Sequence, residues 1–152
     1  MVRIAAGAWR KPVVSAVMVP RRGARLHAFF LAATVPLFLG AALSDYAYTS
    51  TFEVQWSNFA SWLLAGGLVF GGGAIVFALV GLAGLDHRRA LRRVGFLLLL
   101  AMWGLGLIDA FVHARDAWAT MPTGFLLSTV VVVLSVAATW VGFSEFGARP
   151  AP

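Results

Sequence analysis

Four apolar runs dominate the sequence and restrict what the chain can fold into. A helix needs about 20 apolar residues to cross a hydrocarbon core of roughly 30 Å, and each run reaches that length. The runs extend from Leu26 to about Ala47, from about Phe59 to Leu85, from Val94 to about Val112, and from about Thr123 to Phe143. The sequence therefore predicts an all-α fold, a polytopic membrane protein built as a bundle of four transmembrane helices.

The composition agrees with this interpretation. Of the 152 residues, 61% are hydrophobic and 12% are charged, whereas a soluble domain carries about 25% charged residues. A chain with so little charge cannot cover a surface that faces water. The sequence has no cysteine, which excludes disulfides, iron–sulfur clusters and covalent attachment of c-type haem.

The basic residues predict the orientation of the bundle, because Lys and Arg accumulate in short cytoplasmic segments. On one side lie Arg3, Arg10, Lys11, Arg21, Arg22, Arg25, Arg88, Arg89, Arg92, Arg93 and Arg149. Only Arg115 lies on the other side. We therefore expect both termini in the cytoplasm and the protein in a bacterial inner membrane.

This topology also divides the chain and accounts for its net charge of +6. We expect a basic cytoplasmic or interfacial arm over residues 1–25, the transmembrane domain over 26–143 and a short tail over 144–152. The expected partners are the lipid bilayer and either other membrane subunits or a second copy of the chain. We do not expect nucleic acid as a partner, because the orientation of the helices in the membrane already explains where the basic residues lie.

The second run contains the glycine-rich stretch GGLVFGGGAIVFALVGLAG at residues 66–84. A nucleotide fingerprint fails here, because Gly71 and Gly73 are followed by valine at position 76 and the run has no lysine. Small residues instead recur at intervals of four and three and form one helical stripe. The stripe consists of Gly67, Gly71, Ala74, Ala78 and Gly81. Small residues let membrane helices approach closely, so we expect a helix-packing seam with this run at the centre of the bundle; the alternative is that glycine is simply frequent in membrane helices.

Ionisable residues gather near the predicted outer ends of the first and third runs. Asp109 and His113 are four residues apart and share one helical face, and Asp45 belongs to the same layer. A carboxylate within an apolar run is costly unless it is paired or faces water. These three residues are therefore a candidate proton, metal or ligand site, and the alternative is a hydrogen-bonded pair that fixes the helix ends.

At the predicted cytoplasmic end, His27 opens the first run and His87 follows the second. Two facing histidines are the ligand set of a b-type haem, and neighbouring arginines suit its propionates. The alternative is that both histidines are interfacial, because they lie at helix ends among charges. No other motif suggests catalysis: HExxH and GxSxG are both missing from the sequence. We assign no catalytic residue and no metal-binding motif, and an enzyme is not favoured.

In its order of motifs the chain resembles the uncharacterised bacterial family called domain of unknown function 2231, whose members are predicted four-helix inner-membrane proteins. The resemblance covers about residues 26–142. It rests on His27, Pro36, Asp45, Trp62, Leu63, Gly67, Leu68, Val69, Gly84 and Asp86. The family often has a histidine near the start of the third run, where this chain has Arg92, Arg93 and Val94, unless His87 takes its place.

The resemblance also implies a function, because some relatives look like membrane partners of periplasmic quinoprotein dehydrogenases. Our first hypothesis is a non-enzymatic anchor or accessory subunit of a membrane complex, in particular a respiratory or dehydrogenase complex. The second is a small subunit that binds haem or quinone and transfers electrons or protons.

Overall fold

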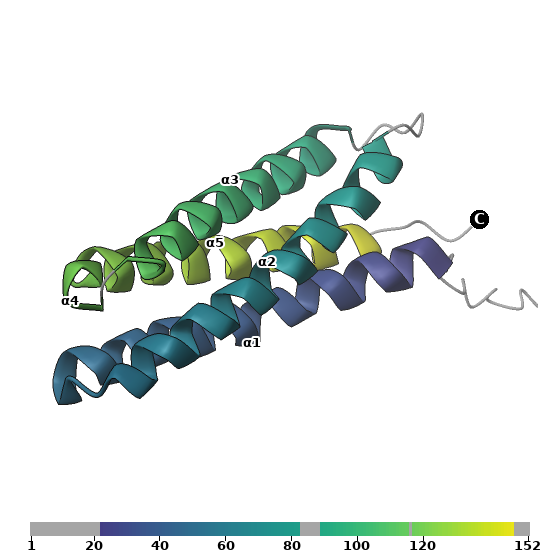
Figure 1. The fold of residues 1–152 in the computed structure, drawn as a ribbon. Helices are drawn as coiled ribbons and strands as arrows, with labels where there is room; N and C mark the ends of the chain where they lie inside the picture. Colours follow the sequence, from purple (N-terminus) through teal and green to yellow (C-terminus); the bar gives the residue numbers. More distant parts are fainter. Residues whose placement is uncertain (1–21, 83–88, 116, 148–152) are drawn as a thin grey trace, which may run out of the picture.

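The computed structural model describes residues 22–82, 89–115 and 117–147, and these form four long helices and one short one (Figure 1). In chain order they are α1 (Arg22–Thr51), α2 (Val54–Leu82), α3 (Arg89–His113), α4 (Ala117–Thr120) and α5 (Thr123–Gly147). The four long helices are long and apolar enough to cross a membrane. This confirms the predicted all-α, four-helix membrane fold.

The helices extend beyond the apolar runs that predicted them. α1 begins at Arg22 and continues to Thr51, and α2 already begins at Val54. Hydropathy locates the part of a helix that lies in hydrocarbon, whereas the helix itself ends where its backbone hydrogen bonds end. The connection between α1 and α2 is therefore only two residues long, and Phe52 turns the chain with a positive φ of 58°.

The four long helices form a ring in which each packs mainly against two neighbours. α1 lies between α2 and α5, and α3 also lies between α2 and α5. α1 and α2 are thus antiparallel neighbours, as their short connection requires. The prediction that the glycine-rich helix is the centre of the bundle is wrong, because α2 has two principal neighbours like the other helices.

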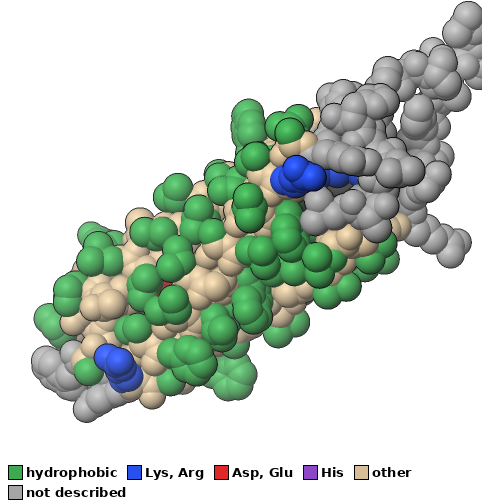
Figure 2. Space-filling view, turned by 90° about the horizontal axis from the view of Figure 1, so that it is seen from above, with side chains coloured by type: hydrophobic (Ala, Val, Ile, Leu, Met, Phe, Trp, Pro, Cys, Tyr) green, Lys and Arg blue, Asp and Glu red, His purple; other side chains and the backbone are tan. Residues whose placement is uncertain are grey.

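The interior of the bundle is built from apolar side chains on all four helices. Leu31 and Phe38 of α1, Leu64 of α2, Met102 of α3 and Val131 of α5 are almost completely buried. Apolar side chains also cover much of the outer surface along the length of the bundle, and the basic side chains visible in Figure 2 lie near its two ends. Such an outer surface suits lipid, where helices satisfy their backbone hydrogen bonds internally.

The small residues of α2 allow close contact with its neighbours. Gly67 and Gly71 are buried, and so is Ala74. A Cβ added to Gly67 would lie 2.6 Å from Cε1 of Phe38 in α1, and one added to Gly71 would lie 3.1 Å from Cε of Met102 in α3. Ala78 is partly buried and packs against the interior cluster. Gly81 is in α2, but its side-chain environment lies outside the described residues.

Candidate functional site

Three of the predicted site residues meet at one end of the bundle. Asp45 comes from α1, while Asp109 and His113 come from α3. Both aspartates are completely buried and His113 is 7% exposed. α1 and α3 are not principal neighbours in the ring, so their polar side chains meet across its centre. The structure therefore brings together three residues that are far apart in the sequence.

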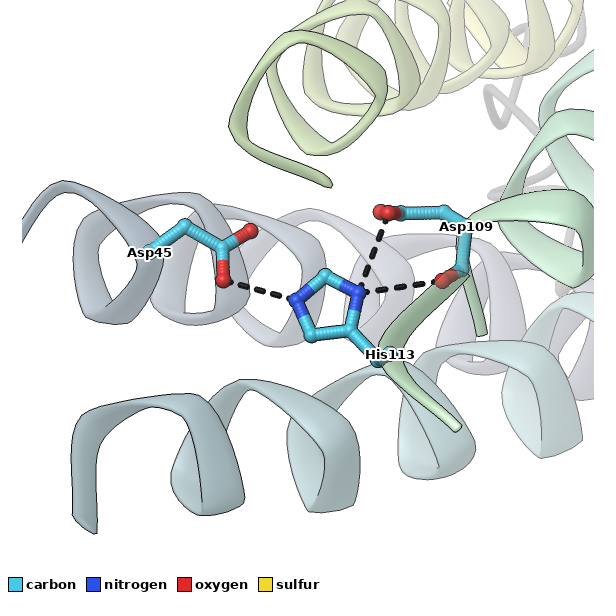
Figure 3. Close-up of side chains that lie close together, drawn as sticks. All are labelled: Asp45, Asp109 and His113. Carbon is cyan, nitrogen blue, oxygen red and sulfur yellow. Dashed lines mark hydrogen bonds and ion pairs between the residues drawn. The ribbon is translucent and has the colours of Figure 1, made fainter. Parts of the chain in front are cut away.

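The imidazole of His113 lies between the two aspartates (Figure 3). Its Nε2 is 2.8 Å from Oδ1 of Asp45. Its Nδ1 is 3.0 Å from the backbone oxygen of Asp109 and 3.2 Å from Oδ1 of the same residue. A backbone carbonyl can only accept a hydrogen bond, so Nδ1 must carry a proton. The orientation and tautomer of the ring follow from this contact.

Ser128 of α5 completes the cluster on the other side of the carboxylates. Its hydroxyl is hydrogen-bonded to Oδ2 of Asp45 and lies 2.8 Å from Oδ2 of Asp109. Ser128 is 1% exposed. We call these four residues the polar cluster: Asp45, Asp109, His113 and Ser128. Their contacts connect the three helices α1, α3 and α5.

Sequence reasoning missed Ser128. The residue lies within the apolar run LLSTVVVV, where a serine is most simply read as a side chain that bonds its own helix backbone. Ser135 in the same helix does so, because its hydroxyl donates to the backbone oxygen of Val132 at 2.8 Å. Only the packing of α5 against α1 and α3 distinguishes the two serines. The one feature of the sequence that could have indicated Ser128 as a site residue is its position, a polar residue at the same depth as Asp109.

The first turn of α5 and the short helix α4 close the end of the bundle beside His113. The hydroxyl of Thr120 in α4 donates to the backbone oxygen of Val112 at 3.4 Å, and Thr120 is completely buried. A Cβ added to Gly124 would lie 2.9 Å from Cε1 of His113 and 2.8 Å from Cγ2 of Thr120. Position 124 therefore needs glycine for the imidazole to fit where it does.

The polar cluster lies near the ends of its helices and still within their apolar spans. Asp45 precedes the end of α1 by six residues, which corresponds to about 9 Å of helix rise. Asp109 lies one helical turn before the end of α3. Asp45 and Asp109 therefore lie about one to two helical turns from the ends of their helices.

One oxygen in the polar cluster has no hydrogen bond. Oδ1 of Asp109 is fully buried and has no hydrogen-bond partner, although it lies 3.2 Å from Nδ1 of His113. A buried carboxylate oxygen without a partner is costly. Asp109 is therefore the member of the polar cluster whose interactions are least complete.

The polar cluster contains the residue types of a hydrolase triad but not its connections. In a triad, the serine is hydrogen-bonded to the imidazole and the imidazole to one carboxylate. Here the Ser128 hydroxyl contacts the two carboxylates, and His113 contacts the aspartates on both sides. The Ser128 hydroxyl therefore contacts two carboxylates and has no hydrogen bond to the imidazole of His113.

The other histidine pair was predicted at the opposite end. His27 lies in α1, and its Nε2 is buried without a hydrogen-bond partner among the described residues. His87 lies outside the described residues. The facing arrangement of His27 and His87 therefore stays a prediction.

The comparisons with known proteins agree with the fold. The family model described as "Predicted membrane protein (DUF2231)" matches residues 23–145, which is most of the chain and includes all four members of the polar cluster. No match was found among the curated proteins or among the solved structures. The chain belongs to this family of membrane proteins.

Proposed function

We propose that this member of the family is a non-enzymatic membrane subunit whose polar cluster binds and releases protons near one surface of the bilayer. The contact of Ser128 with two carboxylates carries the proposal. A hydroxyl group has one hydrogen to donate. When it donates to one aspartate, the other aspartate must be protonated to donate to the serine oxygen.

Counting hydrogens extends this argument to the whole polar cluster. The cluster contains four hydrogen bonds, from Nδ1 to the Asp109 backbone, between Nε2 and Asp45, and between Ser128 and each carboxylate. A neutral imidazole and the serine supply one hydrogen each. Two further protons are needed to form all four bonds, and they balance the two negative charges of the aspartates.

A neutral polar cluster suits the membrane interior. Ionised carboxylates in a transmembrane segment are costly and mark proton relays or ligand paths when they occur. Two protons neutralise the cluster without an external counter-ion. Their release would leave two uncompensated charges, so proton exchange must be coupled to a change of shape or to a partner.

This coupling is why we place the protein in a larger membrane complex. A proton site without catalytic groups suits an accessory subunit or anchor, and a respiratory or dehydrogenase complex is the partner that the family resemblance suggests. Purification from the native membrane in mild detergent tests this part of the proposal. A stable complex with one defined partner is expected, and a chain that purifies only as itself contradicts it.

Infrared spectroscopy of the purified protein tests the proton site directly. A protonated carboxyl group has a carbonyl stretching band separate from those of ionised carboxylates. We expect such a band in the wild type, and its loss or shift in the variants Asp45→Asn and Asp109→Asn. Glu53→Gln is the matched control, because Glu53 is exposed on the α1–α2 connection and its substitution should leave the band unchanged.

Two infrared results would contradict the proposed proton site. If the wild type lacks the band in a folded sample, both aspartates are ionised and the hydrogen count fails. If Glu53→Gln removes the band, the protonated group lies outside the polar cluster. The circular dichroism of each variant establishes that the helices are intact.

A haem- or quinone-binding subunit is the second candidate function, and one observation favours it. The buried Nε2 of His27 has no hydrogen-bond partner among the described residues. A histidine that binds a haem iron needs such a nitrogen. A reduced-minus-oxidised absorption band that is lost in His27→Ala would support this candidate. A colourless protein would remove its haem form.

A further inference from the structure

The polar cluster also contains the donor atoms of a metal site. Asp45, Asp109 and His113 each offer one ligand atom, and these atoms all lie within 4.8 Å of one another. Two atoms bound to one ion at about 2.1 Å are at most about 4.2 Å apart. In a tetrahedral site such atoms are about 3.4 Å apart, so each side chain would move by up to about 0.7 Å to hold a single ion.

The hydrogen bonds of His113 leave the correct nitrogen for a metal ion. Nδ1 donates to the backbone oxygen of Asp109 at 3.0 Å, and Nε2 faces Oδ1 of Asp45 at 2.8 Å. Histidines that bind metals typically donate their second ring N–H to a backbone carbonyl or a carboxylate, which fixes the ring. In His113 the hydrogen bond from Nδ1 to the backbone oxygen of Asp109 is this contact. Nε2 is therefore the nitrogen that would bind the metal ion.

Asp109 provides an independent indication that a ligand belongs here. Its Oδ1 is fully buried, has no hydrogen-bond partner and belongs to a side chain that points toward His113 (Figure 3). The four hydrogen bonds of the polar cluster do not satisfy this oxygen. This oxygen lies 3.2 Å from Nδ1, so the Asp109 carboxylate has to turn from Nδ1 toward Asp45 to hold an ion at Nε2, and the ion would then give this buried carboxylate a full set of partners.

We infer that the polar cluster binds one divalent first-row transition-metal ion, of the type of Zn²⁺, through His113 Nε2 and one carboxylate oxygen each from Asp45 and Asp109. One imidazole and two carboxylates are a nitrogen and oxygen ligand set that such ions accept. This inference rests on the proposed function, because the ion takes the place of the two protons there. The cluster stays neutral in both states.

The ligand set also indicates how the ion is held. Three protein ligands leave a further coordination position open, as in zinc sites that bind a small ligand or pass the ion on. Ser128 contacts both carboxylates and is a positioning residue in this site. The soft metals that need thiolate ligands are excluded, because the chain has no cysteine.

Cobalt binding to the purified protein tests the inference, because Co²⁺ accepts the ligands of Zn²⁺ and its visible spectrum reports their geometry. The full chain in detergent is first treated with a chelator and then titrated with Co²⁺. We expect one ion per chain and a visible band that Zn²⁺ removes by competition. His113→Gln and Asp109→Asn should each weaken binding by more than about 100-fold, because each removes a ligand, whereas the loss of an outer partner costs about 10–100-fold.

Two further variants separate a metal site from general damage to the fold. His27→Gln removes a histidine outside the polar cluster and should bind Co²⁺ as the wild type does. Ser128→Ala keeps all three ligands and should lose about 10-fold to 100-fold in affinity, as expected for an outer partner. Equal binding by the wild type and His113→Gln, or an absence of a cobalt band in the folded wild type, would overturn the metal site.

The proton site and the metal site can fail separately. A protein with the infrared band of a protonated carboxyl but without cobalt binding overturns only the metal inference. A protein that binds one Co²⁺ through His113 but has no such band without metal overturns only the proton site. Both measurements use the same purified chain.

Discussion

The polar cluster and the contact between α1 and α2 join helices by two different kinds of interaction. In the polar cluster, Asp45, His113 and Ser128 connect three helices through hydrogen bonds between specific side-chain atoms. Between α1 and α2, Phe38 lies over Gly67 and Phe30 lies over Gly73, where added Cβ atoms would come within 2.6 Å and 2.5 Å of the rings. These two glycine–ring contacts involve no polar side chain.

The difference teaches which property each region depends on. A hydrogen-bonded cluster in hydrocarbon depends on the chemical identity of each member and on the number of protons it holds. A glycine–aromatic contact depends on volume alone, because lipid offers no hydrophobic contrast and helices gain chiefly from close packing. A substitution of equal size should therefore damage the first region and spare the second.

The largest effect is expected at His113. His113→Ala removes the side chain that contacts both buried aspartates, and removing one partner from such a buried group costs about 3–5 kcal/mol. The free energy of unfolding in mixed detergent measures this loss. His27→Ala is the control, because His27 lies outside the polar cluster, and a loss as large as that of His113→Ala would show that the two regions do not differ.

The next largest effect is expected at the α1–α2 contact. Gly67→Ala places a methyl group against the completely buried ring of Phe38, and such overpacking costs about 1–3 kcal/mol. Gly104→Ala in α3 is the matched control, because an added Cβ meets nothing within 4 Å. We expect this control to be neutral or slightly stabilising in the same unfolding measurement. Equal stability of both variants would mean that the contact is not tight.

A smaller effect separates the two serines of α5. Ser128→Ala removes hydrogen bonds to two buried carboxylates and should cost about 1–3 kcal/mol. Ser135→Ala removes a bond to its own helix backbone, so we expect a cost of under about 1 kcal/mol, a value typical of a single net hydrogen bond. A cost for Ser135→Ala that equals or exceeds that for Ser128→Ala would contradict the role of Ser128 in joining helices.

Reporter fusions should have no effect on stability and decide which side of the membrane the polar cluster approaches. The arginine distribution predicts that a reporter at the C-terminus is cytoplasmic and that one near Thr51 is periplasmic. The polar cluster would then lie near the outer surface, because Asp45 is close to the end of α1. The opposite pattern of reporter activity would place the cluster near the cytoplasm and reverse the direction in which protons reach it.

Much of the fold could be predicted from the chain because hydrocarbon imposes a simple rule. An apolar run of about 20 residues must form a helix in lipid, since no water is available to its backbone. The four helices therefore follow from four runs. The short helix α4 does not, because four residues outside the apolar runs carry no comparable signal.

The polar cluster could be predicted only in part. Asp109 and His113 are one helical turn apart, and Asp45 has the same depth in a different run, so their types and spacings indicate a shared site. Ser128 gives a weaker signal, because a single serine in an apolar run is expected to bond its own helix backbone, as Ser135 does. Only the ring order of the helices decides that α5 packs against both of the helices that carry the aspartates.

By itself, the sequence determined that the chain crosses a membrane four times and carries two acids and a histidine at one depth, because hydropathy and helical periodicity are local properties. The tertiary structure alone decided that α2 is one wall of a ring, that His113 reaches Asp45 across it and that Ser128 joins both carboxylates. These facts depend on which helices become neighbours. Side-chain volumes and the hydrogen bonds between helices, which are not local, select that arrangement.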